Sequence, residues 1–227
     1  MRRLSGTKWQ EVESKQPRIE GFKTILPMLF QEKEVGLFSE EFMAQLHVHS
    51  SQLIKVIQAK GGITWNKTTD IMNILDQTED IHVKRECILK YLIIYLGEDE
   101  KDLIREYLES QADEAVKDLE QLTMAVLVIR KEGEGPKHPP DDIGVVIKGV
   151  EVVNELTSVA SACAILLCLI YALDLSYPKT LHFTFEVFQE ILVQLNQHKM
   201  SPKVQSLCCE LSKKSKRSKK KHCVYLF

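Results

Sequence analysis

Residues 124–153 read MAVLVIRKEGEGPKHPPDDIGVVIKGVEVV, and in this stretch the spacing of the apolar residues changes. Two β-branched, nearly continuous apolar runs, about 124–130 and 143–150, enclose a polar loop rich in glycine and proline. Such runs are typical of buried strands, and the loop between them predicts a hairpin with a long connection. The segments on either side have helical spacing instead. We therefore expect a mainly α protein with one β-hairpin.

Before the hairpin, apolar residues recur every three to four positions, as they do in helices packed on a core. This spacing predicts helices over about 40–60, 70–75, 80–96, 99–110 and 112–122. Ser39 and Thr69 stand where N-caps are expected. Gly61 and Gly97 follow the last apolar residues of two of these helices, so we expect them to end there.

Directly after the hairpin, residues 156–173 read LTSVASACAILLCLIYAL and contain no charge. A helix that spans a bilayer needs about 20 apolar residues, so this run lies at the lower edge of that length. Its first third is rich in Thr, Ser and Ala, whose small side chains let neighbouring helices approach closely. We expect a buried central helix in a helical domain, and a membrane span is the alternative.

Two further helices are expected near the C-terminal end. Tyr177-Pro178-Lys179 predicts a turn that stops the central helix, with an exposed recognition turn as the alternative. Thr180 then caps a helix over about 181–197, and Ser201-Pro202 begins a short terminal helix. The inward side chains of the longer helix are expected to be Phe185, Phe188, Ile191, Leu192 and Leu195.

The charge of the chain is unevenly distributed. The 227 residues are 44% hydrophobic and carry a net charge of −2, which excludes a disordered protein and fits a soluble globular one. Residues 212–227, however, hold seven basic residues and no acid, so residues 1–211 carry 23 basic against 32 acidic residues, a net −9. We expect an irregular segment over 1–37, a mainly helical domain with the hairpin over 38–211, and a disordered basic tail over 212–227.

Several motifs after the hairpin loop form a recognisable series. They are DIGVVI at 142–147, GVEVV at 149–153, LIYALDLSYPK at 169–179, TFEVFQ at 184–189 and SPKVQSL at 201–207. This series resembles the C-terminal region of the uncharacterised vertebrate proteins of the sterile-alpha-motif-domain-containing-protein-3-like group. The resemblance implies a fold and a modular, protein-binding role, but no catalytic residues. We expect the sterile alpha motif of some members to be missing here, and the basic tail departs from the group's pattern.

The basic tail is the candidate functional segment of the sequence. A dense basic block repels itself and favours disorder, and it is typical of a nuclear-import signal or of contact with an anionic surface. The residues expected to make this contact are Lys213, Lys214, Lys216, Arg217, Lys219, Lys220 and Lys221. Phosphorylation of Ser215 or Ser218 would lower the local charge, so these two are candidates for a switch.

No residue pattern predicts a catalytic, cofactor or metal site. His47 and His49 are two positions apart, and on a regular helix such side chains point in nearly opposite directions. Cys163 and Cys168 lie in the most apolar segment, where burial raises the pKa of a thiol and makes it behave as a small hydrophobe. Around Gly133-Glu134-Gly135 the acidic residue would repel a phosphate.

These observations predict a non-enzymatic protein-interaction module without a cofactor. We expect it to be nuclear, with cytoplasmic as the alternative, and to bind an import receptor through the tail. The first alternative function is a nucleic-acid-associated protein that binds weakly and non-specifically through the tail. The second is a membrane-associated protein that uses 156–173 or the tail, although we expect no stable insertion. The protein partners and the oligomeric state do not follow from the sequence.

Overall fold

The structure, a computed structural model, describes residues 33–60, 63–195 and 200–221. Its helices are α3 (Lys33–Lys60), α4 (Ile63–Gln77), α5 (Ile81–Tyr95), α6 (Glu100–Leu103), α7 (Ala112–Leu119), α8 (Val159–Ala172), α9 (His182–Val187) and α10 (Pro202–Lys221). Its strands are β1 (Ile104–Leu108), β2 (Met124–Arg130), β3 (Asp142–Ile147) and β4 (Val150–Val153). Three short turns of other helical types are η1 (Glu109–Gln111), η2 (Lys179–Leu181) and η3 (Phe188–Leu192). Helices dominate, so the prediction of a mainly α protein is confirmed.

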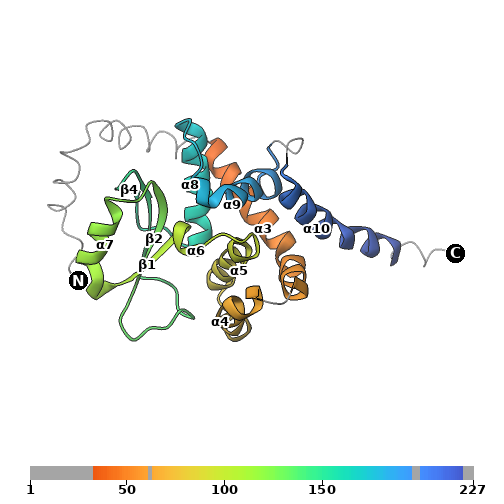
Figure 1. The fold of residues 1–227 in the computed structure, drawn as a ribbon, viewed down its shortest axis with the longest axis horizontal. Coiled ribbons are helices and arrows are strands. Elements are labelled where there is room, and N and C mark those ends of the chain that lie inside the picture. Colours follow the sequence, from red (N-terminus) through yellow and green to blue (C-terminus); the bar gives the residue numbers. More distant parts are fainter. Residues whose placement is uncertain (1–32, 61–62, 196–199, 222–227) are drawn as a thin grey trace.

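The predicted hairpin is present as the centre of a larger sheet (Figure 1). Strands β2 and β3 pair antiparallel, with Met124 opposite Ile147 and Val128 opposite Ile143. The strand order is β1-β2-β3-β4, and β1 lies parallel to β2. The prediction of a single hairpin was therefore incomplete, because the sheet has four strands of mixed direction.

Strand β1 replaces part of a predicted helix. The prediction of a helix over 99–110 is wrong: only the single turn of α6, capped by the Asp99 carboxylate, precedes a strand. In β1, Ile104 pairs with Val126 of β2. Parallel pairing with β2 outweighs the helical spacing of the apolar residues in this segment, so the segment forms a strand. The short helix α7 then connects β1 to β2.

Strand β4 arises from a tight turn inside the second predicted run. Lys148 and Gly149 both have positive φ, 51° and 79°, which is the geometry of a two-residue type I′ hairpin turn. Their backbone N–H groups donate to Thr123 O and Leu122 O, at 2.7 and 2.9 Å. The turn ends β3 at Ile147 and sends the chain back along it. The predicted strand over 143–150 is therefore two strands.

Helix α8 lies between the sheet and the helical layer (Figure 1). It packs on β2 and β3 and also on α3 and α5. Nine of its fourteen residues are buried, so the prediction of a buried central helix is confirmed. Among the helices of the described segments, none combines the length and apolar character that crossing a bilayer requires.

Several helix boundaries differ from those predicted. Helix α3 begins at Lys33 rather than near residue 40, so Ser39 lies inside it, and α4 runs from 63 to 77 rather than from 70 to 75. Helix α7 ends at Leu119 rather than near 122. Helix α10 extends to Lys221, whereas we expected a short helix followed by disorder from residue 212. Lysine and arginine are good helix formers, so the basic composition does not stop the helix.

The predicted helix over 181–197 is broken into η2, α9 and η3. Its N-cap is not Thr180, since the Glu98 carboxylate accepts from the backbone N–H groups of Phe183 and Thr184 at 2.7 and 2.8 Å. The wider turn of η3 ends the helix early, and Gln194 has a φ of 60°. Leu195 is therefore 44% exposed rather than inward.

Candidate functional site

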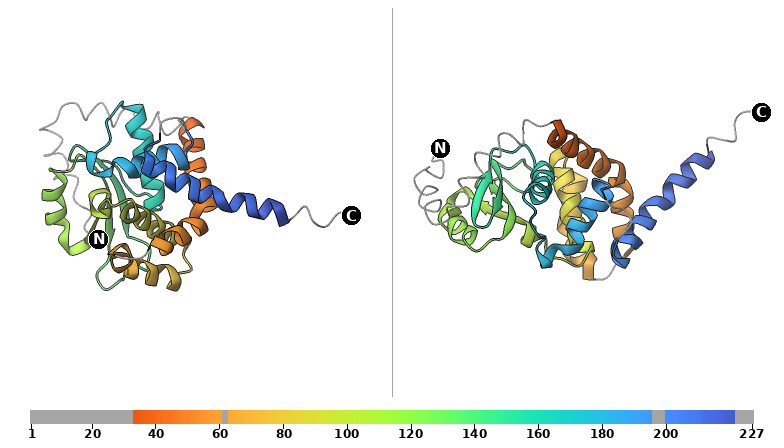
Figure 2. Two further views of the ribbon diagram at one scale, coloured as in Figure 1. Left: turned by 45° about the vertical axis from the view of Figure 1, so that its right-hand side comes forward. Right: turned by 90° about the horizontal axis from the view of Figure 1, so that it is seen from above.

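The predicted basic segment lies on the second half of α10, and the structure places all nine of its named positions there. These are Lys213, Lys214, Ser215, Lys216, Arg217, Ser218, Lys219, Lys220 and Lys221. Their side chains lie outside the described residues, so their contacts stay predictions. In the two views of Figure 2, the last turns of α10 extend away from the other elements. We call residues 213–221 the basic arm.

The first half of α10 is seated on the helical core. Val204, Leu207 and Leu211 are buried and lie three to four residues apart, so they form one face of the helix. This face packs on α3 and α9. Gln52 Nε2 donates to Glu210 O at 3.4 Å, which joins α3 directly to α10.

Lys203 fixes the start of α10 against two other helices. Its Nζ donates to Leu96 O, a carbonyl at the C-terminal end of α5, at 2.5 Å. A cation is favourable there because the helix dipole makes this end partly negative. The same Nζ lies 4.3 Å from the centre of the Phe183 ring, within reach of a cation–π contact. The basic arm is thus attached to the body through a well-held helix.

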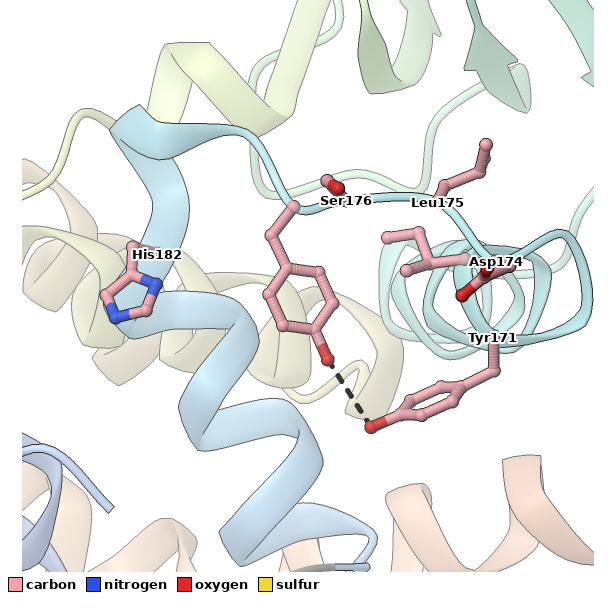
Figure 3. A pocket seen from close by; sticks show the side chains of 7 residues that line it. Tyr171, Asp174, Leu175, Ser176 and His182 are labelled. Atoms are coloured by element: carbon pink, nitrogen blue, oxygen red, sulfur yellow. Dashed lines mark hydrogen bonds between the residues drawn. The ribbon is translucent and has the colours of Figure 1, made fainter. Parts of the chain in front are cut away.

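A second candidate site is an open pocket of about 370 Å³ at the C-terminal end of α8 (Figure 3). Its walls are Ile170, Tyr171, Asp174, Leu175, Ser176, Tyr177 and His182. Asp174 and His182 lie at opposite ends of it (Figure 3). All of these residues lie within 170–182, and sequence reasoning missed the pocket because it interpreted this stretch as a helix end and a turn.

The two tyrosines of this pocket are linked and neutral. A hydrogen bond of 3.4 Å joins the Tyr177 and Tyr171 hydroxyls, and Tyr177 also donates to Gln189 Oε1. The Tyr177 ring stacks on Phe185, with 5.1 Å between centroids and 8° between planes. Burial raises the pKa of both hydroxyls above 10, so they stay protonated at neutral pH. Tyr177 packs under its turn, as expected, while its hydroxyl lies at a pocket.

A third polar feature, the ionic cluster, joins α5 to the sheet. Arg130 of β2 places Nη2 2.5 Å from Glu86 Oε1 and Nε 2.9 Å from Glu106 Oε1. Lys90 Nζ lies 2.6 and 3.0 Å from the same two oxygens. Arg130 also donates to His138 O and so holds the loop between β2 and β3. The charges of two acidic and two basic side chains cancel, so we interpret this cluster as structural: it holds α5 against the sheet. The spacing of Glu86 and Lys90 is the one signal for it in the sequence.

The cysteines and histidines of the described residues can be compared with the arrangement that a reactive site requires. Burial raises the pKa of Cys163 and Cys168, as expected, and raises that of Cys87 to about 11 with help from Glu86. These thiols are therefore protonated at neutral pH. His47 is exposed and His49 is half-buried on α3. Within the described segments, no group of three or more His, Cys, Asp or Glu side chains could hold a metal ion.

Comparison with known proteins gives no relative: no family model, curated protein or solved structure matches the chain. The function is therefore inferred from the geometry and charge of the chain itself.

Proposed function

We propose that this protein is a non-enzymatic protein-interaction module that enters the nucleus through its basic arm. The observation that carries the proposal is the course of α10. Its last described buried side chain is Leu211, and the helix continues to Lys221 away from the other elements (Figure 2). An import receptor needs a basic segment that it can reach, and this geometry supports such access.

The charge distribution supports the same proposal. Residues 1–211 carry a net charge of −9, whereas the arm is purely basic. Separating the two signs along the chain leaves the arm as the part that attracts an acidic groove on a receptor. Membership of the sterile-alpha-motif-domain-containing-protein-3-like group, a part of this proposal, rests on the motifs between 142 and 207 and favours a protein-binding role for the body.

The localisation claim is tested with the full chain fused to a fluorescent reporter. We expect nuclear accumulation, and we expect its loss when the seven basic residues of the arm are replaced by Gln. The matched control replaces three exposed lysines of the body, Lys55, Lys117 and Lys148, and should leave localisation unchanged. A wild-type fusion spread evenly between nucleus and cytoplasm would contradict the proposal.

The interaction claim is tested by proximity labelling in cells, with and without the seven substitutions. If the body binds partners independently of the arm, a common set of labelled proteins should persist when the variant is brought to the nucleus by an unrelated signal. Loss of every specific partner from that rescued variant would place binding in the arm instead.

A further inference from the structure

The end of α8 has a well-defined hydrogen-bond pattern with an unusual residue at its centre. Leu175 N donates to Ile170 O at 2.9 Å and Asp174 N donates to Tyr171 O at 3.2 Å, which is the Schellman pattern of helix ends. The residue at the turn must be left-handed, and Asp174 has a φ of 49°. Glycine is the residue that adopts this conformation without strain.

Helix α5 of the same chain ends in the same way with glycine. Glu98 N donates to Ile93 O at 3.2 Å and Gly97 N donates to Ile94 O at 2.9 Å. Gly97 has a φ of 72°. The two helix ends are thus equivalent in backbone geometry, and they differ in that α8 carries a carboxylate where α5 carries no side chain.

The Asp174 carboxylate does not stabilise the fold. Aspartate tolerates the left-handed region better than most residues but still costs more there than glycine, and a negative charge is unfavourable beside the negative end of a helix dipole. Within the described part of the chain, no basic nitrogen lies within 4.0 Å of this carboxylate and no donor hydrogen bonds to it. It is exposed, and it stands at the pocket that the tyrosines line (Figure 3). An exposed carboxylate without a partner at a pocket is available to a ligand of opposite charge.

The pocket has the chemistry of a cation site. Asp174 supplies a negative charge, the tyrosine hydroxyls are neutral acceptors, and no lining residue is Lys or Arg. The one basic lining residue, His182, lies at the opposite end of the pocket from Asp174 (Figure 3). Phe185 stacks on one face of the Tyr177 ring, and Tyr177 is also one of the residues that line the pocket. Aromatic faces attract cations, and the apolar side chains of Ile170 and Leu175 suit an aliphatic stem.

We propose that this pocket binds the alkylammonium group of a lysine side chain in a partner protein. The ammonium lies against Asp174 and the end of α8, with the tyrosine rings beside it, and the methylene stem contacts the apolar wall. The site belongs to the folded body, so it is independent of the basic arm and of nuclear entry.

The proposal is tested by NMR titration of the full chain at constant ionic strength and pH 7.5. The probe is n-butylammonium chloride, with n-butanol as its neutral counterpart. We expect saturable shifts of the amides of 174–177 with a dissociation constant of about 1–10 mM for the ammonium, and none with the alcohol. A lysine-containing tetrapeptide should bind at least as tightly, and its Lys→Gln form should not bind.

Two variants separate binding from folding. Asp174→Asn and Asp174→Gly should each weaken n-butylammonium binding by about fivefold or more, because the charge is gone. Both should also raise the melting temperature, because repulsion at the helix end is relieved. Asp174→Gly should raise it by about 2 °C or more, because the strain of a Cβ at positive φ is relieved as well. Equal shifts with butanol, unchanged binding in Asp174→Asn, or a less stable Asp174→Gly would each overturn the proposal.

Discussion

At the scale of single residues, the positions with positive φ show which turns the sequence predicts and which it does not. Gly97 and Gly149 occupy such positions as glycines, whereas Lys148 and Asp174 do so at a cost. The end of α5 at Gly97 could be predicted because glycine there is itself the signal. The turn at Lys148 could not, because lysine is not typical of a type I′ turn. Its conformation depends on the backbone contacts with residues 122 and 123.

Replacing Gly97 by alanine should destabilise the protein by about 1 kcal/mol, because a Cβ is strained at a φ of 72°. The nearest atom to the new Cβ would be Lys203 Nζ at 3.5 Å, an ordinary contact, so the effect comes from the backbone. Urea unfolding followed by circular dichroism measures it. Gly135→Ala is the control, since that Cβ would meet nothing within 4 Å. It should change the free energy of unfolding by no more than about 0.5 kcal/mol. Equal stability of the two variants would contradict the described end of α5.

At the scale of elements, the ionic cluster is a polar link between the helical layer and the sheet, in addition to the packing of α8 on both. Glu86 and Lys90 come from α5, Glu106 from β1 and Arg130 from β2. Burial by itself would raise the pKa of Glu106, but the charges and hydrogen bonds of Lys90 and Arg130 outweigh it and lower that pKa. The ionised form of Glu106 therefore contributes to the docking of these elements.

The sign of the pH dependence follows from the lowered pKa. A carboxyl that ionises more readily in the folded state adds stability above its ordinary pKa of 4.5, and that stability is lost as the pH falls through the lower, folded value. Glu106→Gln should therefore be less stable than the wild type at pH 7. It should also lose less of its unfolding free energy than the wild type as the pH is lowered below about 4.5.

Urea unfolding at pH 7, 5, 4 and 3 measures this difference. Glu132→Gln, an exposed loop substitution, is the control and should follow the wild-type profile. Parallel profiles for the wild type and Glu106→Gln would show that the cluster does not depend on this carboxylate.

The helices and strands also differ in whether the sequence could predict them. Strand β2 and the buried helix α8 were predictable because continuous apolar composition specifies burial on every side. Strand β1 was not, because its helical spacing is overridden by pairing with residues about twenty positions later. The start of α9 likewise depends on Glu98, which is distant in sequence.

At the scale of the whole molecule, acidic and basic residues occupy different parts of the chain. The body repels phosphate-rich partners, and the basic arm attracts them. The arm was predictable from the sequence because charge is read directly from composition. Its presentation on a helix was not, because that depends on how Val204, Leu207 and Leu211 seat the first half of α10.

Any nucleic-acid binding should therefore reside in the arm and depend strongly on salt. For double-stranded DNA, the logarithm of the binding constant should fall against the logarithm of the salt concentration with a slope no steeper than about −6, the limit for seven phosphate contacts. Fluorescence anisotropy with unrelated DNA duplexes measures the slope and should give similar affinities for all of them. Replacing Ser215 and Ser218 by Asp should make the slope shallower and weaken binding. A chain ending at Ser212 that binds as well as the full chain would contradict this assignment.

The seating of α10 also determines how the molecule responds to mechanical force. A partner that binds the arm and exerts force on it pulls on α10. This force reaches α3 and α9 through the buried side chains of Val204, Leu207 and Leu211. Force applied at the C-terminal end of a helix lying on a surface peels it, so Leu211 is loaded first and Val204 last. Exposing each of these buried side chains to water costs about 1.5–3 kcal/mol. A receptor that tugs on the arm would therefore detach α10 turn by turn before it strains the sheet.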